Sequence, residues 1–487
     1  VGSEMCIRDS LIQTLYSHKP ASALSYEIKC FYIPAIYYNH YLDENAFFSY
    51  NRQMWSLNSH IYQTILRGKI MPENFHIDMP EAVRNIIHTI EEHGFKAYAV
   101  GGCIRDSILG RNPDDWDITT SAVPSQIKTF FKRTIDTGIA HGTVTIMIDK
   151  TGYEVTTYRI DGEYEDGRHP KSVEFSDRLV DDLCRRDFTI NAMAYNDTDG
   201  FVDEFNGLDD LDAKIIRCVG EPELRFTEDA LRMMRAIRFS AQLGFTIDEA
   251  TWNAIKKLAP SISKISMERV HVELGKTLMS AHPDYVAQYS EAGLFAPILP
   301  VIDNALKSRY KRKILATLQH TPDNIYLRYA ALFITSTPDE AAKTLRALKL
   351  DNKTVDTVSK LVKLSKIDIE ETEPAVRTAL NQYGRDFLPL WHELMMAVIQ
   401  ASEDITGISN PAKVKHLLTL KRLGTDILAR GDCFTIKDLD ISGNDLIEYG
   451  LQGHEIGETL KSLLDIVIEN PKLNDKATLI AMIEHIK

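Results

Sequence analysis

The spacing of hydrophobic residues indicates a helix followed by a buried strand. Apolar residues recur every three or four positions between 83 and 90, as on one face of a helix, and Gly94 follows as a C-terminal cap. The apolar run Ala97–Val100 predicts a buried strand, because it is short and a glycine pair follows it. Gly101-Gly102 then predicts a sharp turn into a short helix over 103–109.

Further short strands follow this turn, and then the pattern becomes helical. The predicted strands are 116–119, 143–148 and 154–159, with a turn at Thr151-Gly152. From about residue 222 onward the apolar spacing is almost purely helical, beginning with 228–242, 250–258 and 265–279. The predicted fold class is therefore α+β, in which an α/β head with a mixed or antiparallel sheet precedes an elongated all-α region.

Composition supports a globular protein and excludes several other classes. The 487 residues are 44% hydrophobic and 26% charged, unlike a disordered or fibrous chain. No uncharged apolar run approaches the ~18–20 residues that span a bilayer, which argues against an integral membrane protein. With 56 Lys and Arg against 69 Asp and Glu, the formal charge of −13 argues against a general nucleic-acid coat protein. The six scattered cysteines suit reduced thiols in a cytosol.

Residues 1–70 differ from the rest of the chain and carry no recognisable chemistry. They are rich in Tyr, His and Asn and lack the pattern of a secretory signal. Residues 6–10 (CIRDS) repeat residues 103–107, but no glycine pair precedes the first copy. We therefore expect 1–70 to be an N-terminal extension, foreign to the protein or spurious, with the first domain beginning near Met71.

The glycine pair and two aspartates close behind it form the sharpest candidate site. Asp115 and Asp117 would project from the same side of one strand, because side chains alternate along a strand. Two carboxylates so close repel each other and are best reconciled by a shared divalent cation. Free N–H groups at a strand-to-helix turn favour phosphate, and Arg105 could add a bidentate contact. The pattern predicts a site for Mg²⁺ and a nucleoside triphosphate, with a solvated acidic turn as the alternative.

Three other features could contribute to this site. Glu154 opens a predicted strand, and a third carboxylate is typical of two-metal phosphoryl transfer, although an exposed strand glutamate is the alternative. Arg185 and Arg186 suit a triphosphate as well as they suit a surface position beside a helix. Residues 161–170 are polar, contain two glycines and end in proline, which predicts a mobile surface loop.

The segment 228–239 (EDALRMMRAIRF) predicts an amphipathic helix whose arginines lie opposite its apolar stripe. Asp229 would neighbour Arg232 at i+3. A carboxylate accepts from an exocyclic amino group while a guanidinium donates to a ring acceptor, so this pair would accept cytosine and adenine and reject uracil and guanine. The alternative is a solvated face with one ion pair. Arg238 has the weakest case, since it lies about 180° from Asp229 around the helix.

Together these motifs resemble the class II tRNA nucleotidyltransferases, the bacterial-type CCA-adding enzymes of the tRNA nucleotidyltransferase/poly(A) polymerase family in the polymerase β superfamily. The resemblance covers about residues 75–487, and a weaker similarity that includes 436–451 reaches the end of the chain. The matching segments are GGCIRDSILGRNPDDWDITT (101–120), EVTTYR (154–159), the 161–170 loop, DDLCRRDFTINAMAY (181–195), DEFNGLDDL (203–211), EDALRMMRAIRF (228–239) and ISMERVHVELGKTL (265–278).

The resemblance implies a role for each candidate residue. Asp115 and Asp117 would bind the metal, with Mg²⁺ as cofactor, and Glu154 would be a third catalytic carboxylate. The nucleotide-binding residues would be Gly102, Arg105, Arg186, Asp229, Arg232, Arg235 and Arg238. Among these, Asp229 and Arg232 would read the base. The implied regions are a head (71–206), a helical neck (207–280), a body (281–380) and a tail (381–487).

The implied reaction is template-independent addition of C, C and A to the 3′ end of tRNA from CTP and ATP. The tRNA 3′-hydroxyl would attack the α-phosphate and release pyrophosphate, assisted by two metal ions. We expect a cytoplasmic enzyme with no membrane segment and no stable protein partner. The tRNA acceptor arm would lie on basic segments that could equally be solvated helix faces: 307–313 (KSRYKRK), Lys360, Lys363, Lys366, Lys413, Lys415, Lys421 and Arg422.

Three alternatives remain open. Bacterial poly(A) polymerases share the head motifs, but 133–143 (RTIDTGIAHGT) lacks their arginine-rich segment. A partial enzyme that adds only C or only A is the second alternative. The third is an RNA-binding pseudoenzyme, which has no need for two repelling aspartates. A metal-dependent HD phosphohydrolase domain, present in some relatives, is not expected because 327–333 (LRYAALF) contains no His-Asp pair.

Overall fold

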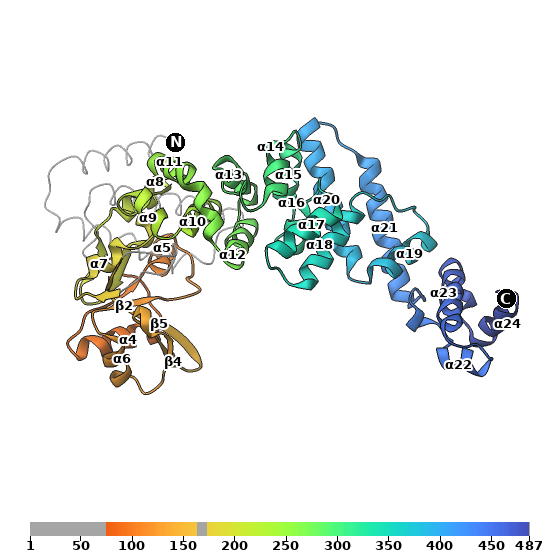
Figure 1. Ribbon diagram of the computed structural model, residues 1–487, viewed down its shortest axis with the longest axis horizontal. Coiled ribbons are helices and arrows are strands. Elements are labelled where there is room, and N and C mark those ends of the chain that lie inside the picture. The colour runs from red at the N-terminus through yellow and green to blue at the C-terminus, as the bar shows by residue number, and fades with distance from the viewer. Residues whose placement is uncertain (1–74, 163–172, 487) are drawn as a thin grey trace, which may run out of the picture. The chain divides into compact units, whose positions relative to one another are not determined.

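The computed structural model describes residues 75–162 and 173–486 of the chain (Figure 1). All the elements below belong to the unit His76–Lys487. The expected N-terminal extension 1–70 lies outside the described residues, as does the 161–170 loop after its first two positions.

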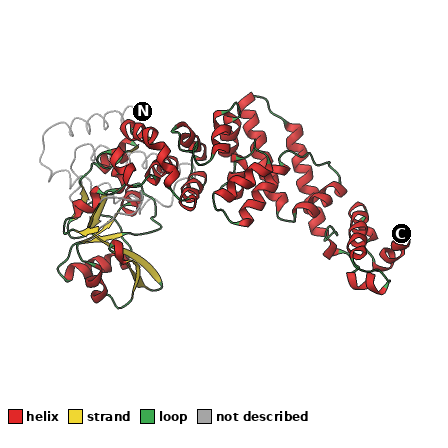
Figure 2. Cartoon of the chain, in the orientation of Figure 1, coloured by secondary structure: helices red, strands yellow, loops and turns green. Residues whose placement is uncertain are grey.

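A seven-stranded sheet lies in the head, with the strand order β3-β4-β5-β2-β1-β8-β9. Figure 2 shows the strands of the head in yellow. Of the neighbouring pairs, β2 and β5 run parallel and the other five run antiparallel, which confirms the mixed sheet. The strands in this order are β3 Thr134–Gly138, β4 Thr143–Ile148, β5 Thr151–Thr157, β2 Ile118–Thr120, β1 Ala97–Val100, β8 Met193–Asn196 and β9 Gly200–Asp203. Both β1 and β4 begin and end at the predicted residues.

The turn between β4 and β5 differs from the prediction. Asp149 and Lys150 form it with φ angles of 47° and 70°, and Ile148 pairs with Thr151. A two-residue hairpin loop requires positive φ at both positions, and here residues other than glycine supply it. Gly152 instead lies inside β5, where an added Cβ would come within 2.8 Å of the Thr145 side chain. Close packing, not turn geometry, therefore explains this glycine.

Helices and a short two-stranded ribbon complete the head, and a second short ribbon follows after residue 206. The apolar face predicted between residues 83 and 90 is buried on α4, which packs against β1 and β2. The helices are α4 Glu81–Glu92, α5 Gly102–Ile108, α6 Pro124–Phe130 and α7 Leu179–Cys184, with 3₁₀ turns at Ile139–His141 and Thr189–Asn191. The ribbons pair β6 Arg159–Asp161 with β7 Val173–Phe175, and β10 Ile215–Ile216 with β11 Thr246–Ile247.

After residue 206 the described chain is almost wholly helical, which confirms the α+β fold class (Figure 2). The first helices are α8 Gly207–Ala213, α9 Pro222–Glu228, α10 Leu231–Leu243, α11 Glu249–Leu258 and α12 Met267–Leu278. They are followed by α13 Ala287–Glu291, α14 Pro300–Lys307, α15 Lys311–His320, α16 Ile325–Leu332, α17 Pro338–Ala347, α18 Asn352–Leu364 and α19 Glu373–Tyr383. The last are α20 Phe387–Thr406, α21 Pro411–Arg430, α22 Gly443–Glu448, α23 His454–Glu469 and α24 Lys476–Ile486. None of the described helices is both long and apolar enough to cross a membrane.

The predicted single helix over 228–239 is wrong in one respect. Asp229 has an extended backbone, with φ −144° and ψ 104°, so α9 ends before it and α10 begins two residues later. The Asp229 carboxylate accepts from the Leu231 N–H at 3.0 Å, which satisfies a free donor at the start of α10. Because of this break, Asp229 lies between two helices, and its side chain does not have the neighbours expected for a helical position.

Candidate active site

The turn after β1 brings the glycine pair beside the two aspartates. The Val100 N–H donates to the Asp117 carbonyl at 3.0 Å, so Asp117 lies at the end of β1 where the turn begins. Gly101 has a φ of +88°, and an added Cβ there would lie 2.8 Å from Arg186 Nη1. At Gly102, the nearest atom to an added Cβ is Arg105 Nη2 at 3.6 Å, an ordinary contact. Gly101 is thus the position that requires glycine.

Asp115 and Asp117 precede β2, so the prediction that one strand presents both carboxylates is wrong. β1 ends at Val100, and residues before Asp117 therefore have no partner strand on that side. Both side chains are exposed. The pKa of Asp117 is raised from its ordinary value because nearby protein atoms withhold water from it and because Asp115 is negative, while Arg186 opposes the shift. The two aspartates thus repel each other, as expected of a pair that shares a cation.

Glu154 lies beside this pair in the sheet. β2 and β5 are parallel with Ile118 opposite Val155, so Glu154 comes one residue before Val155 and Asp117 one residue before Ile118. Its side chain is exposed. Within the ranges that the structure describes, no three His, Cys, Asp or Glu side chains are gathered closely enough to hold a metal. A cation here would therefore take its remaining ligands from water or from the phosphates of a substrate.

Arg105 is held by the protein on two sides. Its Nε and Nη2 donate to the Asp106 carboxylate at 3.0 and 2.7 Å, and its Nη1 donates to Asn191 Oδ1 at 2.6 Å. The residue is 8% exposed. The sequence indicated neither partner, because Asp106 reads as a surface residue and Asn191 lies far along the chain.

Arg186 lies against the glycine turn, with its Nη1 facing Gly101. Its Nη2 donates to Asp182 Oδ2 at 3.2 Å, and Arg185 donates to Asp182 Oδ1 at 2.6 and 2.9 Å. Burial acts to raise the pKa of Asp182, but the two arginines hold it below its ordinary value. The Nε of Arg186 is buried and has no hydrogen-bond partner. One guanidinium donor at the turn is therefore unused.

Asp229 pairs with a residue that the sequence did not single out. Its two carboxylate oxygens accept from Arg269 of α12, from Nη1 at 3.3 Å and from Nη2 at 2.7 Å. The predicted Asp229–Arg232 ion pair is not formed, because the break before α10 turns the aspartate toward α12. Arg232 instead donates to Glu228 Oε2 at 2.5 Å and to the Arg185 carbonyl at 2.9 Å.

The remaining arginines of α10 face protein, so the alternative of a solvated helix face is wrong. Arg235 Nε donates to Asp187 Oδ2 at 2.7 Å. Arg238 is 6% exposed and lies 3.0 Å from Glu273 Oε2 of α12. The predicted apolar stripe of this segment is buried as expected: Ala230, Met233, Met234, Ile237 and Ala241.

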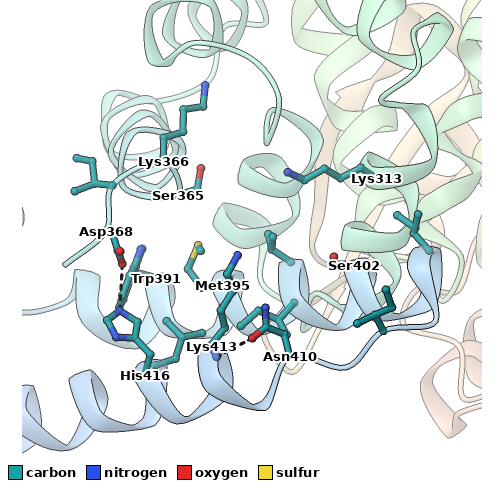
Figure 3. Close-up of a pocket in the computed structure, with 16 residues that line it drawn as sticks. Lys313, Ser365, Lys366, Asp368, Trp391, Met395, Ser402, Asn410, Lys413 and His416 are labelled. Carbon is teal, nitrogen blue, oxygen red and sulfur yellow. Dashed lines mark hydrogen bonds and ion pairs between the residues drawn. The ribbon is translucent and has the colours of Figure 1, made fainter. Parts of the chain in front are cut away.

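A separate recess of about 590 Å³ lies between α15, α20, α21 and the end of α18 (Figure 3). Apolar side chains that include Trp391 and Leu417 form part of its lining, and Lys313, Lys366 and Lys413 also line it. None of these three lysines forms an ion pair with another described residue, although Lys366 donates to the Ser336 carbonyl. We call this site the lysine recess.

Comparison with known proteins places the chain in a family. The family model of the poly A polymerase head domain matches residues 97–217, and a model for a probable RNA and SrmB-binding site of polymerase A matches 244–306. A model for a putative tRNA nucleotidyltransferase domain 2 matches 323–483. The CCA-adding enzyme of Limosilactobacillus fermentum is 37% identical over 407 residues, which are 82% of this chain and 95% of that enzyme. The chain belongs to the CCA-adding enzymes.

Other members agree over similar lengths. The CCA-adding enzyme of Levilactobacillus brevis is 36% identical over 420 residues, covering 85% of this chain and 98% of that enzyme. The crystal structure of the Bacillus stearothermophilus CCA-adding enzyme in complex with CTP has a TM-score of 0.65 and 32% identity, covering 83% of this chain and 96% of that one. The family confirms the predicted nucleotidyltransferase and its need for a divalent metal.

Proposed function

We propose that this CCA-adding enzyme joins nucleotides to tRNA at the turn between β1 and α5, beside Asp115 and Asp117. The enzyme adds C, C and A to the 3′ end of tRNA from CTP and ATP. In the proposed step the tRNA 3′-hydroxyl attacks the α-phosphate in line, and pyrophosphate leaves. The observation that carries this proposal is the repelling aspartate pair beside a glycine turn, against which the Arg186 guanidinium packs.

The aspartate pair fits a hard divalent cation, and we propose Mg²⁺, which is usually held by one or two carboxylates together with substrate phosphates. Glu154 would be a third catalytic carboxylate but not a metal ligand, since Val155, the next residue, pairs with Ile118, the residue after Asp117. When bound, such cations lower the pKa of the attacking hydroxyl and stabilise the leaving oxygens, in a two-metal arrangement.

Arg186 would bind the triphosphate. It lies against Gly101, and it shares the single Asp182 carboxylate with Arg185, which leaves net positive charge at the turn. Arg105 would add positive charge near the turn, and three of its five N–H donors are already engaged by Asp106 and Asn191. Gly102 would contact the nucleotide through its backbone, at the start of α5.

Asp229 and Arg232 would read the base, with Arg235 and Arg238 in support. A carboxylate has about four acceptor positions. In Asp229, Oδ1 accepts from Leu231 and Arg269 and Oδ2 from Arg269, which leaves capacity on Oδ2 for an exocyclic amino group. The Nε–H of Arg232 takes part in none of its hydrogen bonds and could donate to the base. Cytosine and adenine present the matching edge.

The lysine recess would contact the tRNA backbone. RNA binding requires local positive charge, and Lys313, Lys366 and Lys413 offer it without a carboxylate partner among the described residues. Three other lysines of the predicted basic segments are already neutralised: Lys307 pairs with Asp303, Lys311 with Glu291 and Lys360 with Asp356. The net charge of −13 is therefore compatible with a local RNA grip.

We also propose the division into head (71–206), neck (207–280), body (281–380) and tail (381–487), and a cytoplasmic location without a stable protein partner. The location is supported by the cysteines of the described chain, which are all free thiols: Cys103, Cys184, Cys218 and Cys433.

One experiment tests the reaction and its alternatives. The protein is incubated with tRNAs that end before the CCA tail, after C and after CC, each with one labelled nucleotide at a time, and the products are sequenced. The expected result is C on the first two tRNAs, A on the third, and no addition of U or G. A long run of A would indicate a poly(A) polymerase, and loss of either C or A addition would indicate a partial enzyme.

A further inference from the structure

A continuous series of polar contacts joins the glycine turn to the base-side helix α10. Arg105 Nη1 donates to Asn191 Oδ1 at 2.6 Å, and Asn191 Nδ2 donates to Asp187 Oδ1 at 3.0 Å. Asp187 Oδ2 then accepts from Arg235 Nε at 2.7 Å. The series starts on α5, passes through the segment after α7 and ends on α10. We call Asn191 and Asp187 the head–neck link.

Burial makes these contacts hard to replace. Arg105, Asp187 and Asn191 are 8%, 8% and 6% exposed. If a buried polar group loses its hydrogen-bond partner, no water molecule can take the partner's place, and the group stays unsatisfied. Burial acts to raise the pKa of Asp187, but Arg235 and the Asn191 amide hold it below its ordinary value, so the carboxylate stays ionised. The head–neck link therefore holds an ionised Asp187 beside the positive charge of Arg235.

The carboxamide of Asn191 suits its place between a cation and an anion. Its oxygen accepts from a guanidinium while its nitrogen donates to a carboxylate, and a single neutral group satisfies both. A carboxylate at this position would repel Asp187, and an aliphatic side chain would leave both neighbours unpaired.

The Phe239 ring makes a second connection between the same two arginines. The guanidinium carbon of Arg105 lies 5.0 Å from the ring centroid and that of Arg235 lies 5.3 Å from it. Phe239 is on α10, one turn after Arg235. Arg105 of α5 thus reaches α10 in two ways, through the head–neck link and directly at the Phe239 ring.

We infer that Asn191 is a positioning residue for base selection. Through Asp187 it holds the base-side helix in register with the turn that would receive the triphosphate, so that both ends of a nucleotide meet one rigid frame. A uracil or guanine whose edge mismatches Asp229 and Arg232 cannot be accommodated by a shift of α10. This inference rests on the proposed function and adds to it a residue that acts without touching the nucleotide.

The test measures kcat/KM for CTP and for UTP on tRNA that lacks its CCA tail, with the full-length chain. Asn191→Ala is expected to lower the CTP-to-UTP ratio about tenfold, within the range typical of coupling between sites. Asp187→Asn, which keeps the shape of the side chain and removes its charge, is expected to change the ratio in the same direction. If Asn191→Ala does not fold, the CTP-to-UTP ratio of Asp187→Asn tests the inference.

Thr189→Val is the matched control. Thr189 lies in the same 3₁₀ turn, is 3% exposed, and donates to Asp210 Oδ2 at 2.7 Å, away from both arginines. This variant is expected to lower the thermal unfolding midpoint and to leave the ratio unchanged. Folded link variants that keep the wild-type ratio, or a control that lowers it equally, would overturn the inference. Absence of CTP addition by the wild-type chain would instead count against the proposed function.

Discussion

The two sides of the candidate site differ in how much of their bonding capacity the protein itself uses. On the metal side, Asp115 and Asp117 are exposed, and neither side chain forms a hydrogen bond or ion pair with another described residue. On the base side, Asp229 is paired with Arg269, and Arg238 with Glu273. The first pair is left free for a cation and a substrate, whereas the second group is fixed in place before any ligand arrives.

This difference suits the two tasks. A cation brings its own strong attraction and needs ligands that are unsatisfied without it. A group that must reject the wrong base needs a fixed position, because a flexible template would adapt to a mismatch. Substitutions on the metal side should therefore affect the rate with little change in stability, and substitutions on the base side should affect stability or selectivity.

The largest effect is expected for Asp115→Ala. Losing a metal ligand should slow nucleotide addition by about a thousandfold or more, or at least about 4 kcal/mol of barrier, while the exposed position leaves folding intact. Single-turnover addition of CTP and thermal unfolding measure the two effects. Asp114→Ala is the control, since that exposed aspartate adjoins the pair. Normal activity of Asp115→Ala with Mg²⁺ would show that the metal side is misassigned.

The next effect concerns Arg238→Met, which leaves Glu273 buried without its partner. Breaking a buried ion pair should lower the free energy of unfolding by about 3 kcal/mol. The double variant Arg238→Met with Glu273→Leu should recover most of the loss, because it removes both charges. Urea unfolding with a constant m-value measures both variants. Equal stability of the single and double variants would contradict the pairing.

A smaller effect is expected for Arg232→Ala. Removing a charged donor to the base should cost about 1.5 to 3 kcal/mol, which is roughly a tenfold to hundredfold loss of selectivity for C and A over U and G. Competition assays with all four nucleotides measure it, and the affinity for pyrophosphate, which has no base, is the control. If kcat/KM fell by the same factor for every nucleotide, Arg232 would have no part in reading the base.

The smallest effect per residue is expected in the lysine recess. Replacing Lys313, Lys366 and Lys413 with alanine should raise the KM for tRNA with little change in the rate constant for addition. The salt dependence of tRNA binding should weaken by about one unit of slope for each lysine. The matched triple variant at Lys307, Lys311 and Lys360, which are already in ion pairs, should change both much less. Equal changes in the two triple variants would contradict the proposal that the lysine recess contacts tRNA.

Local sequence patterns predicted much of the head. They did not predict contacts between residues that lie far apart in the sequence. β1 and the glycine turn follow from a short apolar run and its stop signal, and β4 from a run of strand-forming residues. The start of β2 depends on where its partner strand ends, which spacing along one segment does not reveal. Likewise, the break at Asp229 goes with a contact to Arg269, 40 residues later.

Some of the missed partners did leave a signal. Arg269 and Glu273 are spaced i, i+4 on α12, so they share one face of that helix, and that face meets Asp229 and Arg238. This pair of opposite charges on one helix face was the signal that the sequence carried. Asn191 and Asp187 lie within the matching segment 181–195, but no local pattern distinguishes them from their neighbours.

The two glycines of the turn should tolerate change very differently. Both φ and the nearby Arg186 guanidinium oppose a methyl group at Gly101, whereas at Gly102 the nearest atom leaves ordinary room for one. In a library randomised at both positions, active clones should retain glycine at 101 and admit alanine at 102. The two glycines are therefore constrained separately. Among functional sequences, substitutions should occur at Gly102 and not at Gly101.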